Sequence, residues 1–336
     1  MLKDTLDYII YDYVRKNRLS KELGLGEDYK VDFLAQGEYN INYILRGSEK
    51  NLVFRVNTGS QLNLDNQIEY EYEALKRLQQ SGVTPEVYYL DASKKDIGYG
   101  ILIMEYLQGE PLKYDRDLDS AALIFSKIHS IDCSTSDYDN FIKEENIFTE
   151  RINEANRLLK DFFISPIIPK DLKRFFYKFI EWAEKNRNIE KYFLENKLNV
   201  INNTEVNSSN FIIGSGKAWL IDWEKPVISD PCQDLTQFLA PTTTLWKADY
   251  KLNLEERKDF FKAYTTYLGM DNNIIEKVDL YNPYLYLRAL SWCAYAFLEY
   301  NKEDKKIKNM DTYRKINQYL DIDFMKDLLR DYKIGV

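Results

Sequence analysis

The hydrophobic pattern of the first hundred residues changes its period several times. Apolar positions at helical spacing over residues 2–14 predict an opening amphipathic helix. Short apolar runs joined by short polar turns then predict an antiparallel sheet. Its strands are expected at residues 29–34, 40–45, 52–56, 87–90 and 101–106. A strongly helical pattern over residues 67–80 separates the third strand from the fourth.

After residue 107 the pattern becomes mainly helical. Amphipathic helices are expected at residues 118–129, 150–163, 170–186, 254–268, 274–300 and 310–332. Pro283 should interrupt the fifth of these, because proline removes a backbone donor and clashes with the preceding turn. We find no internal repeat and no low-complexity linker. The pattern therefore predicts an α+β protein with a sheet domain at 1–107 and a helical domain at 108–336.

Residues 198–234 interrupt the helical part with a different pattern. An apolar run ends at Ile201, and a polar loop carries Glu205 and, five residues later, Asn210. Two short apolar runs flank a glycine-containing turn, which predicts a hairpin. The second run ends in Asp222-Trp223-Glu224. Carboxylate and amide oxygens in such an order suit Mg²⁺, although Asn and Asp are also ordinary turn formers.

Composition excludes several classes of function. The chain has 336 residues, a net charge of -8 and a pI near 5.1, which disfavours nucleic acid as a partner. Acidic character can favour cationic substrates, but solubility explains it more simply. Three scattered cysteines without a C-x-x-C pair argue against disulfides and zinc. The single histidine, His129, makes most histidine-dependent hydrolase chemistry improbable.

We expect a cytoplasmic protein that does not enter a membrane. The first ten residues are broken by charges, unlike a secretory signal. No apolar run approaches the length of about 18 residues that a spanning helix needs. The oligomeric state is left open by the sequence.

Arg55 is a charge within the apolar run of the third expected strand. It could face solvent from a half-buried strand, or its guanidinium could bind phosphates in a bidentate manner. The second role needs an acidic partner on the helix that follows. Glu71 lies one turn before Leu75 on the inward stripe of that helix, so we expect it to orient Arg55.

The order of these elements resembles the aminoglycoside phosphotransferase and choline kinase superfamily, which has the protein-kinase-like fold. The resemblance extends over residues 31–239. Its most specific segments are IMEYLQGEPL, FSKIHSID and NFII…AWLIDWEKPVISDPCQDL. It implies a two-lobe protein with a small antiparallel-sheet N-lobe and a larger, mostly helical C-lobe.

The resemblance also implies a function and the residues for it. The chain would transfer phosphate from ATP or GTP to a hydroxyl of a small molecule, with Asn210 and Asp222 holding Mg²⁺ and Glu205 receiving the proton. Arg55 and Glu71 would clamp the nucleotide phosphates. Further nucleotide contacts are expected from Gly37 in the first hairpin turn, from Met104 before the hinge, and from the hinge backbone at Glu105, Tyr106 and Leu107.

One departure from the family pattern supports an alternative. These families usually have His-Gly-Asp or His-Asn-Asp where this chain has Asn203-Thr204-Glu205. The chain could therefore be a nucleotide-binding sensor or interaction protein with little phosphoryl transfer. Substrate contacts are expected from Glu224, Trp292 and Tyr295, although the spacing of the last two is more typical of a helix core. Aromatic rings with acids would suit a cationic alcohol; aminoglycosides, sugars and nucleosides remain open.

Overall fold

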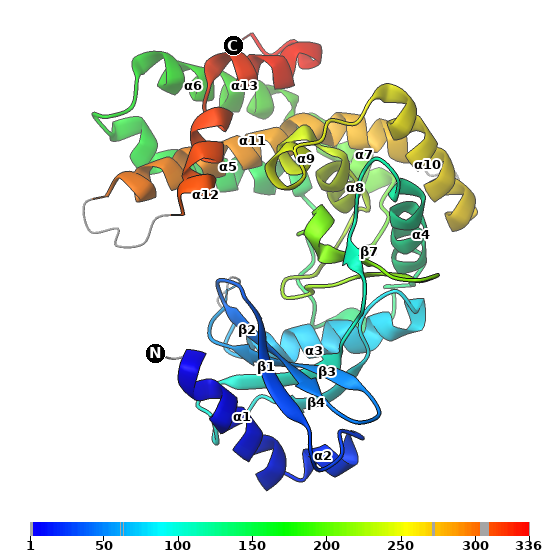
Figure 1. Ribbon diagram of the computed structural model, residues 1–336. Coiled ribbons are helices and arrows are strands. Elements are labelled where there is room, and N and C mark those ends of the chain that lie inside the picture. The colour runs from blue at the N-terminus through cyan, green and yellow to red at the C-terminus, as the bar shows by residue number, and fades with distance from the viewer. Residues whose placement is uncertain (1–2, 61, 63, 271–272, 303–308, 336) are drawn as a thin grey trace. The chain divides into compact units, whose positions relative to one another are not determined.

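The computed structural model describes residues 3–60, 62, 64–270, 273–302 and 309–335. The chain divides into two compact units (Figure 1). Unit 1 consists of Met1–Leu112, Ser126–Ile131 and Ser209–Pro226. Unit 2 consists of Lys113–Phe125, Asp132–Ser208 and Val227–Val336. The α+β class is confirmed, whereas the domain boundary after residue 107 stays a prediction.

Unit 1 is built on a five-stranded antiparallel sheet in the order β1-β2-β3-β5-β4. All five strands were expected, with bounds shifted by a residue or two. They are β1 (Lys30–Gln36), β2 (Asn40–Arg46), β3 (Asn51–Asn57), β4 (Val87–Asp91) and β5 (Gly100–Glu105). The helices of this unit are α1 (Lys3–Lys16), α2 (Leu19–Glu22), α3 (Gln67–Leu78) and the 3₁₀ turn η1 (Gln79–Ser81).

The central strand β3 sends alternate side chains to opposite faces of the sheet. Phe54 contacts Tyr13 of α1 edge to face, with ring centroids 5.9 Å apart. Its neighbour Arg55 points the other way and meets Glu71 of α3. The sheet is therefore covered on both faces, and Arg55 lies beneath α3 instead of facing solvent.

A small second sheet completes unit 1. Strand β8 (Phe211–Ile213) pairs antiparallel with β9 (Ala218–Leu220) and with β6 (Glu110–Pro111). The predicted hairpin is thus confirmed. The backbone N–H of Leu220 donates to the carbonyl of Val83 at 2.9 Å. This bond joins the hairpin to the segment that follows η1.

Unit 2 is mostly helical, as expected. Helix α4 (Leu118–His129) begins in it and ends in unit 1. The other elements are η2 (Ser136–Tyr138), α5 (Ile147–Ile164), α6 (Lys170–Asn186), η3 (Arg187–Ile189), α7 (Glu190–Glu195), β7 (Val200–Asn202), β10 (Val227–Ser229), α8 (Cys232–Leu239), α9 (Pro241–Lys247), α10 (Leu254–Leu268), α11 (Ile274–Asn301), α12 (Met310–Tyr319), α13 (Ile322–Leu329) and η5 (Arg330–Tyr332). The 3₁₀ turn η4 (Ser208–Asn210) links the units.

Two helix predictions are wrong. Helix α11 continues through Pro283, because it is buried along α5 and α8, and that packing outweighs the cost of about 3 kcal/mol for an internal proline. Residues 310–332 form two main helices instead of one. The break occurs at Asp321, whose carboxylate accepts the backbone N–H of Phe324 at 3.0 Å and so caps α13.

No helix within the described ranges combines the length and the apolar character that crossing a bilayer requires.

Candidate functional site

Arg55 is the centre of a buried polar cluster in unit 1. The residue is 6% exposed, although it carries a full charge in the middle of a sheet. It donates to the Glu71 carboxylate, and its Nε donates to the Asn42 side-chain oxygen at 2.9 Å. A buried guanidinium requires such partners, since desolvation is costly without them. The solvent-facing interpretation of Arg55 is therefore wrong.

Glu71 is buried even more completely, at 1% exposed. This burial raises the pKa of Glu71 to about 7, and the opposite charge of Arg55 limits the increase. Burial thus disfavours the charged form of the carboxyl, and Arg55 favours it. The expected Arg55–Glu71 pair is present in the structure; its role in nucleotide binding stays a prediction.

Asp222 connects this cluster to the hairpin. Its Oδ1 lies 3.3 Å from Nη1 of Arg55. The backbone N–H of Ile221, the residue before it, donates to the carbonyl of Asn210 at 2.8 Å. The hairpin thus holds Asn210 next to the segment that carries Asp222, and all three residues belong to unit 1.

The backbone of Asp222 is in the left-handed region, with φ of 63°. Residues other than glycine adopt this region at a cost, and Asp and Asn tolerate it best. The next residue, Trp223, is fully buried, and its Nε1 donates to the Leu220 carbonyl at 3.0 Å. The buried indole of Trp223 anchors this segment, whereas Asp222 and Glu224 on either side of it are half-buried.

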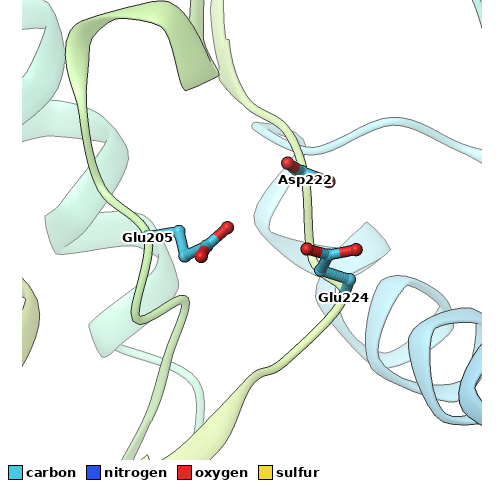
Figure 2. Close-up of side chains that lie close together, drawn as sticks. All are labelled: Glu205, Asp222 and Glu224. Carbon is cyan, nitrogen blue, oxygen red and sulfur yellow. The ribbon is translucent and has the colours of Figure 1, made fainter. Parts of the chain in front are cut away.

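Asp222 and Glu224 form a pair of carboxylates in the segment that follows β9 (Figure 2). They offer oxygen atoms within 4.8 Å of each other. The Glu224 carboxylate accepts a hydrogen bond from Asn40 Nδ2 at 2.5 Å. Its backbone carbonyl accepts one from the Gln67 side chain at the start of α3. Hard oxygen donors of this kind suit Mg²⁺. The expected role of Asn210 as a metal ligand stays a prediction.

Glu205 belongs to unit 2, where it ends the short loop Asn203-Thr204-Glu205 after β7. The loop is held by a carboxylate: Asp234 of α8 accepts the backbone N–H of Asn203 at 2.6 Å and that of Thr204 at 2.8 Å. The Asn203 side chain in turn accepts the Glu205 N–H at 3.0 Å. Figure 2 includes the Glu205 side chain, which is half-buried.

Asp234 was not predicted to have this role. It is 1% exposed, and burial raises its pKa to about 7, while the two backbone donors act to lower it. The sequence offered a signal, because Asp234 follows the Asp222 strand within the motif SDPCQD. Asn42 gave none, since its contact with Arg55 depends on the register of β2 against β3.

The expected hinge follows the end of β5. Met104 is 6% exposed, and the N–H of Glu105 donates to the Glu86 carbonyl at 2.8 Å. The N–H of Tyr106 donates to the Asn51 carbonyl at 3.4 Å, a weak bond. Among the described residues, Leu107 N–H has no hydrogen-bond acceptor, so this donor could pair with a nucleotide base.

Gly37 begins the turn between β1 and β2. Its N–H donates to the Asn40 carbonyl at 2.8 Å. A Cβ placed on Gly37 would approach that carbonyl only to 3.8 Å, which is ordinary contact. The turn therefore does not require glycine here, and the nucleotide role of Gly37 stays a prediction.

Trp292 and Tyr295 of α11 are 44% and 40% exposed. They do not belong to the helix core, in contrast to the buried Leu285. Trp292 contacts Trp246 edge to face, with centroids 5.8 Å apart. Both rings are available to a ligand, and their role as substrate contacts stays a prediction.

His129 offers no alternative base. It is buried at the end of α4, and burial lowers its pKa to about 3, so the imidazole is neutral near pH 7. The acidic side chains above are the groups that could orient a hydroxyl.

The fold is that of the protein-kinase-like small-molecule kinases. The chain belongs to the phosphotransferase enzyme family, whose model matches residues 30–271, which confirms the resemblance.

Solved structures agree on the fold. A choline kinase from Cryptosporidium parvum has a TM-score of 0.64 and 17% identity, with 97% of each chain covered. A choline/ethanolamine kinase family protein from Mesorhizobium loti has a TM-score of 0.63 and 15% identity, with 96% of each chain covered. The spectinomycin phosphotransferase APH(9)-Ia, solved with ADP and spectinomycin, has a TM-score of 0.61 and 13% identity, covering 95% of this chain and 98% of its own. No curated protein sequence matches the chain.

Proposed function

We propose that this chain is a kinase that transfers the γ-phosphoryl group of ATP or GTP to a hydroxyl of a small molecule. The observation that carries the proposal is the buried Arg55, which contacts both Glu71 of α3 and Asp222 after the hairpin. A fixed cation between two acids has little structural purpose in a sheet, since an apolar side chain would fill the place at no cost in desolvation.

Each group of unit 1 has a proposed role in binding. Arg55 donates to the nucleotide phosphates, and Glu71 orients it. Asp222, Glu224 and Asn210 provide the oxygen ligands for Mg²⁺, which when bound would neutralise charge on the phosphates. Backbone groups of the hinge from Glu105 to Leu107, which follows Met104, form hydrogen bonds with the nucleotide base.

Glu205 is proposed to orient the attacking hydroxyl and to accept its proton late in the transfer. Phosphoryl transfer demands little covalent chemistry, so positioning supplies most of the acceleration. A braced loop supports this role, because Asp234 fixes the backbone from which Glu205 extends. The acceptor is a small hydroxyl compound, for which Trp292 and Tyr295 could supply aromatic contacts, a cationic alcohol being one candidate.

The first experiment is a thermal-shift panel with Mg·ATP and Mg·GTP, followed by a screen for ADP or GDP release with amino alcohols, aminoglycosides, sugars and nucleosides. Asp222→Asn should remove the Mg²⁺-dependent stabilisation, because an amide cannot neutralise the metal's charge. Glu27→Gln, an exposed change in the same unit, is the control and should behave as wild type.

With an acceptor in hand, Glu205→Gln should keep nucleotide binding and lose about 10²–10⁴ in turnover, the usual range for general acid–base help. Single-turnover transfer at the wild-type rate would exclude Glu205 as the base. If the nucleotide binds and no acceptor is phosphorylated, the chain is a nucleotide-binding protein of the alternative kind.

A further inference from the structure

A cavity of about 540 Å³ is lined by residues of helices α6 and α13 of unit 2. Figure 1 shows these two helices side by side. Neither helix carries a residue of the candidate site. We call this cavity the α6–α13 groove. It is lined by Asp171, Arg174, Phe175, Lys178, Ile322 and Lys326.

Helical spacing explains why these side chains converge. On α6, positions 171, 174, 175 and 178 are separated by three, four and seven residues, so they share one face. On α13, Ile322 and Lys326 are one turn apart and share a face as well. The groove is therefore formed by two regular helix faces and not by a loop.

The charge of the groove is opposite to that of the whole chain. Three basic side chains and one acidic side chain line it, in a protein of net charge -8. Over the described ranges, neither Arg174 nor Lys326 has a carboxylate at ion-pair distance. The nearby Asp327 of α13 is ion-paired with Arg330 instead. Lys178 donates to the Gly335 carbonyl at 2.7 Å.

Apolar side chains also line the α6–α13 groove. Two of the lining residues are apolar: Phe175, which is only 4% exposed, and Ile322, which is half-buried. Sites for small organic ligands typically measure about 300–1,000 Å³ and combine an apolar lining with a few polar groups. Guanidinium and ammonium groups at the rim select carboxylates and phosphates.

We propose that the α6–α13 groove binds a small organic anion, in which a carboxylate or phosphate ester is attached to an apolar body. The anionic group pairs with Arg174 and Lys326, and the apolar body lies on Phe175 and Ile322. This site is separate from the proposed phosphoryl transfer and does not depend on it.

The test is titration calorimetry of the full chain with octanoate and with phenyl phosphate, which distinguish a carboxylate from a phosphate ester. Binding of at least one supports the proposal. Acetate and inorganic phosphate should bind at least about tenfold more weakly, since two buried methylenes already contribute that much. Octan-1-ol, which lacks the charge, should also bind at least about tenfold more weakly.

Variants locate the site. The double variant Arg174→Gln/Lys326→Gln should weaken binding at least about tenfold, and Arg174→Lys should retain most of it. Lys185→Gln, an exposed change on α6 outside the groove, is the matched control and should leave binding unchanged. Circular dichroism should show wild-type folding for each, because the substituted side chains are exposed.

Three results would overturn the proposal. The first is no binding of either anion, and the second is equal binding of octan-1-ol or of the ions without an apolar body. The third is an equal loss in Lys185→Gln, which would mean that general surface charge attracts the anion.

Discussion

The Arg55–Glu71 pair can be tested for function separately from stability. Arg55→Met keeps much of the side-chain volume and leaves Glu71 buried at 1% exposed without its cation. Breaking a buried pair in this way costs about 3–5 kcal/mol. Because the pKa of Glu71 is already about 7, loss of Arg55 should protonate the carboxyl at neutral pH. We therefore expect the lower end, about 3 kcal/mol.

The double variant Arg55→Met/Glu71→Gln removes both charges and should recover most of that stability, because no uncompensated charge remains. It should still bind Mg·ATP at least about tenfold more weakly than wild type, since charge-assisted hydrogen bonds to phosphate contribute about 1.5–3 kcal/mol. We therefore expect this double variant to be nearly as stable as wild type while binding the nucleotide more weakly.

The assays are urea unfolding followed by tryptophan fluorescence and calorimetric titration with Mg·ATP. The matched control is Arg46→Met, which breaks the exposed 2.8 Å pair between Arg46 and Asp32 on the same sheet. It should cost less than about 1 kcal/mol and leave affinity unchanged. Wild-type Mg·ATP affinity in Arg55→Met/Glu71→Gln would refute the reasoning and make the pair structural.

Three further changes test the loop and the buried acids. Thr204→Gly should stabilise the protein by about 1 kcal/mol in urea unfolding, because Thr204 has φ of 68° and glycine adopts it without strain; a loss of stability would contradict this. Asp234→Asn should keep Mg·ATP affinity and lower turnover, since a carboxylate that accepts two backbone N–H groups is replaced; unchanged turnover would exclude bracing by Asp234. Glu71 has its pKa raised from 4.5 to about 7, so its contribution to stability is present below pH 4.5 and lost as pH rises through 7. Unfolding at pH 5 and pH 8 should therefore differ more in wild type than in Glu71→Gln, and equal differences would contradict the assignment.

Local periodicity was sufficient to predict most of the fold. The strands of unit 1 and the long helices of unit 2 follow alternating or helical patterns that depend only on nearby residues. The two errors have different causes, one tertiary and one local. Pro283 is tolerated because burial of α11 stabilises the helix more than the proline destabilises it, and the break at Asp321 depends on a cap that the period of the pattern does not reveal.

The candidate site was predictable where a charge occurred in an apolar pattern. Arg55 and Glu71 were found in this way, because a charge inside a strand needs a partner. Asn42 and the contact between Asn40 and Glu224 depend on strand register and on the approach of segments distant in sequence. No local pattern specifies such contacts, so only the structure identifies them.

The loop Asn203-Thr204-Glu205 has an unusual backbone conformation at its middle residue. Thr204 adopts a left-handed φ of 68°, which a β-branched residue does only under strain. Two hydrogen bonds to the buried Asp234 keep the loop in this conformation. A strained backbone persists only where surrounding contacts hold it in place, and such residues cluster at functional sites. A loop that carried no function could relax, so the strained and braced Thr204 favours a working Glu205 over the purely nucleotide-binding alternative.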